Sequence, residues 1–180
     1  IEAIGEKTPE HANAMNELAK LFPASRFIHV LRDGRDVCLS GWHFSQKWSP
    51  EALKDTTLAQ FVAHYAGAWR SRVTQAREFG DAHPGRLLEI RYEALHANPE
   101  AEIKRLLEFI QVASAPDIIA SCLEAGSFEA SSGGRIRGDE AQNSFFRKGI
   151  VGDHKGYFDN DAFAAFEKAA GPLLRELDYD

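Results

Sequence analysis

Apolar positions along this chain follow two patterns. Two stretches, 27–31 and 86–92, contain apolar runs too short for helices, which predicts buried strands. Apolar residues with a helical period predict helices over five further stretches: 9–22, 58–78, 98–110, 118–124 and 161–177. Strands that alternate with helices predict an α/β fold in which helices flank a parallel sheet. Folds of this kind bind ligands at the carboxyl ends of their strands.

A charged turn joins the first predicted strand to a helix. Asp33 is expected to cap this helix, with Asp36 in its first turn. Such a turn directs backbone N–H groups and the positive end of the helix dipole at one spot. Arg32 at the strand end and Ser40 on the second helical turn add a guanidinium and a hydroxyl, so the turn is a candidate oxyanion site. The alternative is that Arg32 simply pairs with Asp36.

Composition narrows the class of protein. The length of 180 residues predicts a single domain over 1–180, and 44% hydrophobic with 27% charged residues is typical of a soluble globular protein. A net charge of −6 argues against nucleic-acid binding. We expect no membrane span and no secretion signal. The two cysteines, Cys38 and Cys122, fall on predicted helices, which favours unpaired core residues and a cytoplasmic protein.

The strand–turn–helix segment also carries a resemblance. Residues 32–40 read Arg-Asp-Gly-Arg-Asp-Val-Cys-Leu-Ser. They resemble the segment that binds the 3′-phosphate in the sulfotransferases that use 3′-phosphoadenosine 5′-phosphosulfate (PAPS). The family pattern is Arg-Asp-Pro/Gly-Arg-Asp-Val-x-x-Ser, and every fixed position is met here. The resemblance implies that Arg32 and Ser40 bind the nucleotide.

A second segment, far along the chain, resembles the same family. Residues 147–154, Arg-Lys-Gly-Ile-Val-Gly-Asp-His, are similar to the Arg-Lys-Gly-x-x-Gly-Asp-Trp segment that closes over the 3′-phosphate. Two adjacent cations beside a glycine suit a phosphate. The resemblance implies nucleotide-binding roles for Arg147, Lys148 and Gly149. His154 departs from the family's usual tryptophan, so we expect different packing of this segment.

The resemblance extends to catalysis at the N-terminal end. Glu6-Lys7-Thr8-Pro9 looks like the segment that carries the catalytic glutamate of heparan-type sulfotransferases. It implies that Glu6 is the base and that Lys7 stabilises charge. His11 is the second candidate base, because the cytosolic small-molecule sulfotransferases use a histidine. On sequence alone, the favoured interpretation is that Glu6 and Lys7 are solvated turn charges, as most charged residues are.

Two aromatic residues match family segments that contact adenine. Tyr92 lies in Arg-Tyr-Glu-Ala-Leu, which resembles a Tyr-Glu-Asp-Leu segment at a strand end. Phe128 lies in Gly-Ser-Phe-Glu, which resembles Thr-Ser-Phe-Glu, with Gly126 in place of the threonine. The resemblance therefore implies that Tyr92 contacts the nucleotide base and that Phe128 packs on it.

The family implies a P-loop-NTPase-like, three-layer fold. Its loop for the 5′-phosphosulfate, a Lys- and Ser/Thr-containing turn after the first strand, has no match in these 180 residues. We therefore expect a sulfotransferase domain that lacks its first strand and loop. Unpaired sheet edges favour self-association, so a homo-oligomer is one of the expected states of the protein.

The implied activity is transfer of a sulfuryl group from PAPS to an acceptor hydroxyl or amine of a small molecule or glycan. No metal is expected, since the histidines and cysteines lack metal-ligand spacing. The loop 131–143 is expected to border the acceptor pocket. One alternative is a PAP- or PAPS-binding pseudoenzyme or inactive fragment, PAP being 3′-phosphoadenosine 5′-phosphate. A nucleotide-kinase-like protein is disfavoured, because no Walker-type loop is present.

Overall fold

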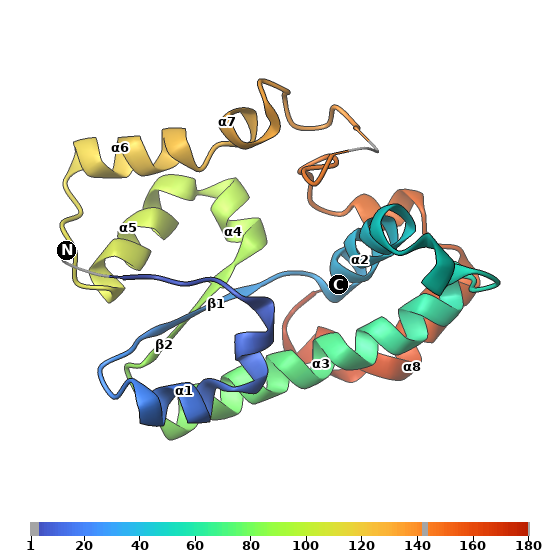
Figure 1. Ribbon diagram of the computed structural model, residues 1–180, viewed down its shortest axis with the longest axis horizontal. Coiled ribbons are helices and arrows are strands. Elements are labelled where there is room, and N and C mark those ends of the chain that lie inside the picture. The colour runs from blue at the N-terminus through green and yellow to red at the C-terminus, as the bar shows by residue number, and fades with distance from the viewer. Residues whose placement is uncertain (1–3, 142–143, 180) are drawn as a thin grey trace. The chain divides into compact units, whose positions relative to one another are not determined.

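The computed structural model describes residues 4–141 and 144–179 (Figure 1). The chain divides into two compact units, and each is assembled from two separate stretches. Unit 1 comprises Ile1–Leu31 and Arg72–Gly126, and unit 2 comprises Arg32–Ser71 and Ser127–Asp180.

Unit 1 contains the sheet. In the described residues the sheet consists of β1 (Phe27–Leu31) and β2 (Leu87–Arg91), which run parallel with Phe27 opposite Leu87 and Leu31 opposite Arg91. The remaining elements of unit 1 are helical: η1 (Pro9–Asn13), α1 (Met15–Leu21), the end of α3 (Leu58–Ala82), α4 (Tyr92–Ala97), α5 (Pro99–Phe109) and α6 (Pro116–Ala125). The predicted parallel α/β arrangement is therefore confirmed.

The core of unit 1 forms between α1 and the end of α3. Met15 and Ala19 of α1 pack on Ala76 and Phe79 of α3, and the Phe27 ring of β1 meets Phe79 edge-on at 4.8 Å between ring centroids. The alternate residues of β1 are exposed, Val30 to 53%. The prediction that this strand is buried is therefore wrong for one of its faces within the described residues. Ile28 and Val30 are exposed on that face, whereas Leu31 on the other face is buried.

The N-terminal helix differs most from its prediction. Instead of one helix over 9–22, a 3-10 turn ends at Asn13 and a short α-helix begins at Met15, because Ala14 between them has non-helical dihedrals. Thr8 does not cap this segment; its hydroxyl donates to Glu6 instead, at 2.6 Å. Residues 4–5, which precede this segment, form no strand, and residues 1–3 lie outside the described residues.

Unit 2 is helical: α2 (Gly34–Trp48), η2 (Pro50–Leu53), the beginning of α3, α7 (Phe128–Ser132), η3 (Asp153–Gly156) and α8 (Asn160–Glu176). The N-cap at Asp33 is confirmed, since its side chain accepts a hydrogen bond from the Arg35 N–H at 2.8 Å. A Cβ on Gly34 would lie 2.7 Å from both the Phe166 and Trp69 rings. Only glycine therefore lets α2 begin this close to α3 and α8.

Helix ends elsewhere differ from the predictions by a few residues. α3 continues to Ala82, beyond the predicted end at Glu78, and α6 begins at Pro116. α5 begins at Pro99, within the predicted range 98–110, and the Asn98 side chain makes no capping bond. The first two residues of the predicted loop 131–143 belong to α7. These differences do not change the order of elements.

Candidate functional site

A buried carboxylate joins the two charged segments within unit 2. Asp36 on α2 accepts hydrogen bonds from the Gly152 N–H at 2.7 Å, from the His154 N–H at 3.0 Å and from the His154 ring at 2.8 Å between Nδ1 and Oδ1. Arg32 also donates to Asp36, at 3.2 Å. The segments singled out in the sequence, 32–40 and 147–154, therefore meet in the folded chain.

Asp36 is ionised in this setting. Burial by itself would raise its pKa, but the hydrogen bonds from His154, the charge of Arg32 and the N–H of Gly152 outweigh it. Together they hold the pKa of Asp36 well below its usual range. The Arg32–Asp36 pair considered as the alternative is thus present, and Arg32 in addition donates to the Ile150 carbonyl at 3.1 Å.

His154, which bonds to Asp36 at this junction, is buried. Its ring lies edge-on to Phe158 and Phe163, with centroid distances of 5.9 and 6.1 Å. Its Nε2 is buried and has no hydrogen-bond partner among the described residues. At the position of the family's tryptophan, His154 therefore packs its ring against two phenylalanines and donates a ring N–H to Asp36.

Arg147 and Lys148 are both directed onto carboxylates of unit 2. Arg147 pairs with Asp153 and, at 2.7 Å, with Glu140. Lys148 lies 3.0 Å from Asp153 and 3.4 Å from Glu140. Burial would lower the pKa of Arg147, but these carboxylates outweigh it and raise that pKa; hydrogen bonding to Asp153 raises the pKa of Lys148. Both side chains are therefore charged. Together they form a cation site that contacts the carboxylate oxygens of Asp153 and Glu140.

Tyr157 belongs to the same cluster. The Arg147 guanidinium and the Lys148 ammonium lie 5.4 and 5.2 Å from the centre of its ring, which is the geometry of cation–π contacts. Its hydroxyl donates to Glu140 at 3.3 Å. No spacing or motif in the sequence points to Tyr157 or Glu140, and our sequence analysis missed both.

Phe128 and Gly149 are in direct contact. Gly149 has a left-handed φ of +67°, and a Cβ at this position would lie 2.5 Å from the Phe128 ring. Arg135 covers this ring, with its guanidinium carbon 5.3 Å from the ring centre. Two residues assigned to nucleotide binding by resemblance are therefore adjacent. Ser40 lies exposed on the second turn of α2.

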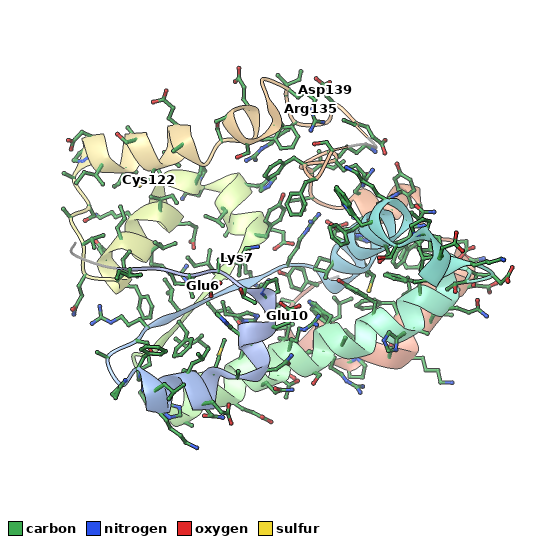
Figure 2. All side chains as sticks on the ribbon, in the orientation of Figure 1. Glu6, Lys7, Glu10, Cys122, Arg135 and Asp139 are labelled. Atoms are coloured by element: carbon green, nitrogen blue, oxygen red, sulfur yellow. The ribbon has the colours of Figure 1, made fainter. Side chains whose placement is uncertain are left out.

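Arg135 fixes the loop that follows α7. It donates to the backbone carbonyls of Asp139, Arg147 and Phe146 and to the Ser144 hydroxyl. Figure 2 shows Arg135 and Asp139 on this loop. Residues 142–143, within the predicted loop 131–143, lie outside the described residues.

The remaining candidates lie in unit 1. Glu6 and His11 form a pair, with 3.0 Å between the Glu6 carboxylate and the His11 Nδ1. Lys7 is exposed beside Glu6 (Figure 2). Tyr92 is the first residue of α4, and the centroid of its ring lies 4.4 Å from the centroid of the His96 ring. The two candidate bases, treated as alternatives in the sequence, thus lie in direct contact.

Both cysteines are unpaired. Burial raises the pKa of the Cys38 thiol to about 12, with a further contribution from the charge of Asp33. Cys38 is therefore a core side chain with little thiolate character. None of the helices in the described part of the chain is long and apolar enough to cross a membrane.

Comparison with known proteins supports one family. A profile described as "Sulfotransferase domain" matches residues 8–178. Sulfotransferase 1B1 of Mus musculus is 31% identical over 147 residues, which are 74% of this chain and 48% of the relative. Sulfotransferase 1A1 of Bos taurus is 29% identical over 169 residues, 83% of this chain and 57% of the relative. The chain thus spans about half the length of these curated relatives.

A solved structure gives the same result for the fold. The crystal structure of mouse sulfotransferase SULT7A1 complexed with PAP matches with a TM-score of 0.67 at 21% identity, over 86% of this chain and 59% of that one. The α/β fold is therefore the sulfotransferase fold. Because the family profile covers nearly the whole sequence, the chain belongs to the sulfotransferase domain family.

Proposed function

We propose that this protein transfers a sulfuryl group from PAPS to an acceptor hydroxyl or amine. The observation that carries the proposal is the junction at Asp36, which brings the segment of Arg32 together with that of Arg147 and Lys148. Family membership supports it, as does the presence of PAP in the solved mouse relative.

The nucleotide would be held by the residues that resemble the family segments. Arg147, Lys148 and the Gly149 N–H offer charge-assisted and backbone donors for the 3′-phosphate, and Arg32 and Ser40 complete the set. The cation site suits this ligand, because its two cations already contact the anionic oxygens of Glu140 and Asp153. Phe128 supplies an aromatic face beside Gly149 for adenine, and Tyr92 is the second proposed contact to the base.

The reaction needs a base and stabilisation of the leaving group. In the proposed step Glu6 removes the acceptor proton as the acceptor oxygen or nitrogen bonds to sulfur. The bond between sulfur and the bridging phosphate oxygen breaks, and the negative charge that remains on PAP requires cations. Lys7 is proposed to stabilise charge. Because His11 is paired with Glu6, it either orients the carboxylate or serves as the base itself.

The acceptor is proposed to be a small molecule or a glycan, bordered by the loop 131–143. We also propose a cytoplasmic location, because both cysteines are unpaired. We propose that no nucleic acid binds, because the net charge is −6.

Calorimetric titration of the chain with PAP and with AMP tests the proposal. AMP lacks the 3′-phosphate, so PAP should bind at least about tenfold more tightly. Arg32→Ala should weaken PAP binding by about tenfold and leave AMP binding nearly unchanged. Arg175→Ala, at an exposed arginine on α8, is the control and should change neither. Equal affinities for PAP and AMP would remove the basis of the proposal.

The second candidate function is PAP or PAPS binding without transfer. It requires only the segments 32–40 and 147–154, which meet at Asp36. A transfer assay on the purified chain separates the two functions. Transfer by this chain alone would exclude the binding-only function.

A further inference from the structure

We propose that Glu140 is a built-in competitor of the nucleotide phosphate. Its carboxylate occupies the anion site formed by Arg147, Lys148 and Tyr157, and a phosphate binds there after the Glu140 side chain has moved away. This inference rests on the proposed function, in which Arg147 and Lys148 hold the 3′-phosphate.

The contacts of Glu140 are those expected of a bound anion. One carboxylate oxygen accepts from the Arg147 guanidinium at 2.7 Å, and the other lies 3.4 Å from the Lys148 ammonium. The Tyr157 hydroxyl lies 3.3 Å from both oxygens. Hydrogen bonding to Arg147 lowers the pKa of Glu140, so the carboxylate is ionised at neutral pH.

Two carboxylates share this site, and their burial distinguishes their roles. The Asp153 side chain is 8% exposed and lies at the start of η3, next to the junction at Asp36. The Glu140 side chain is 30% exposed and belongs to a loop. Rotation of Glu140 into water is therefore cheap, whereas loss of Asp153 from the cluster would leave a buried charge. Asp153 is a permanent partner of the cations, and Glu140 is the exchangeable one.

The loop keeps Glu140 close to the cations. The Ala141 N–H donates to the Arg147 carbonyl at 3.0 Å, and the Gly138 N–H donates to the Lys148 carbonyl at 2.9 Å. Arg135 holds the carbonyl of Asp139, the residue before Glu140. Backbone bonds on both sides of Glu140 therefore fix its main chain, and the tethered carboxylate competes at a high effective concentration. A phosphate competes through its greater charge and its third oxygen.

Competition of this kind weakens the apparent affinity by the fraction of molecules in which the site is open. If Glu140 occupies the site about four-fifths of the time, Glu140→Gln and Glu140→Ala should tighten PAP binding about fivefold. AMP, which lacks the 3′-phosphate, should bind these variants as it binds the original chain. Asp139→Asn removes the same charge one residue away and should change PAP affinity less than about twofold.

Calorimetry with PAP and AMP on these three variants and on Arg147→Ala tests the inference. Tighter PAP binding in both Glu140 variants, with Asp139→Asn unchanged, supports it. If Arg147→Ala weakens PAP binding but the Glu140 variants bind PAP no more tightly than the original chain, Glu140 is not a competitor, while the proposed function stands. If Arg147→Ala leaves PAP binding unchanged, the phosphate is held elsewhere, and the proposed site and this inference both fall.

Discussion

Asp36 and His154, 118 residues apart in the chain, are joined by two hydrogen bonds to the same carboxylate oxygen. One comes from the His154 backbone and the other from its ring, so the contact fixes both the path of the chain and the direction of the imidazole. Because Arg147 and Lys148 precede His154 by only a few residues, this pair positions the proposed phosphate site.

Removal of the Asp36 charge should therefore destabilise unit 2. Asp36→Asn leaves Arg32 and His154 facing a neutral group in a buried position, and breaking one side of such a pair costs about 3 kcal/mol of the free energy of unfolding. Chemical denaturation measures this loss. Asp81→Asn, at an exposed aspartate on α3, should change the free energy of unfolding by less than about 0.5 kcal/mol. Similar losses in both variants would show that the Asp36 contacts contribute no more to the free energy of unfolding than an exposed aspartate does.

Stability at acid pH should depend on Glu89 in unit 1. Glu89 accepts from the His29 ring at 3.1 Å across the strand pair and from Arg77 at 2.9 Å. The His29 bond, and then Arg77, lower its pKa from 4.5 to about 2 despite partial burial, which opposes the shift. Between these two values the unfolded chain binds more protons than the folded one, so stability falls as the pH falls.

The contribution of Glu89 should be fully present above about pH 4.5 and amount to about 2 kcal/mol after allowance for solvent. Urea unfolding of the original chain and of Glu89→Gln, compared at about pH 5.5 and about pH 2.5, measures it. The difference between the two proteins should shrink at the lower pH. A difference that stays constant between the two pH values would contradict the assignment.

The contact between Gly149 and Phe128 should not tolerate a methyl group. Gly149→Ala meets two costs, a left-handed backbone at φ +67° and a ring 2.5 Å from the new Cβ. Gly152→Ala meets only the first, because its φ is +78° and no atom lies within 4 Å of the new Cβ. We expect Gly152→Ala to lose about 1 kcal/mol and Gly149→Ala to lose clearly more, with weaker PAP binding. Thermal unfolding and PAP titration measure both variants, and equal losses would mean that the Phe128 ring simply moves aside.

The Glu6–His11 pair requires a test of each member. In enzyme that transfers sulfuryl groups, Glu6→Gln should lower turnover by about 10²-fold or more while PAPS still binds, if Glu6 is the base. His11→Ala should then have a smaller effect, through loss of the 3.0 Å contact that orients Glu6. Steady-state rates and PAPS affinity measured on both variants decide the roles. Abolished turnover in His11→Ala with an intact rate in Glu6→Gln would reverse the assignment.

Local signals predicted the strand at 27–31, the N-cap at Asp33 and the helix that follows, because each depends on residues a few positions apart. The same signals failed at Ala14, where a favourable apolar spacing did not prevent a break between two short helices. The roles of Glu140 and Tyr157 were not predictable in this way. Both depend on side-chain contacts between residues 7 to 17 positions apart, outside the regular helices and strands. Contacts of this kind leave no period or spacing in the sequence.

The interleaving of the two units has a consequence for synthesis on the ribosome. β1 must wait for β2, whose paired residue Glu89 emerges 60 positions after His29. α2 waits longer still, since the partners of Asp36 emerge 116 and 118 positions after it. Neither unit can close as soon as its first stretch appears, so the apolar surface of the early elements stays open during translation. We therefore expect the early elements of this chain to depend during translation on factors that shield nascent apolar segments.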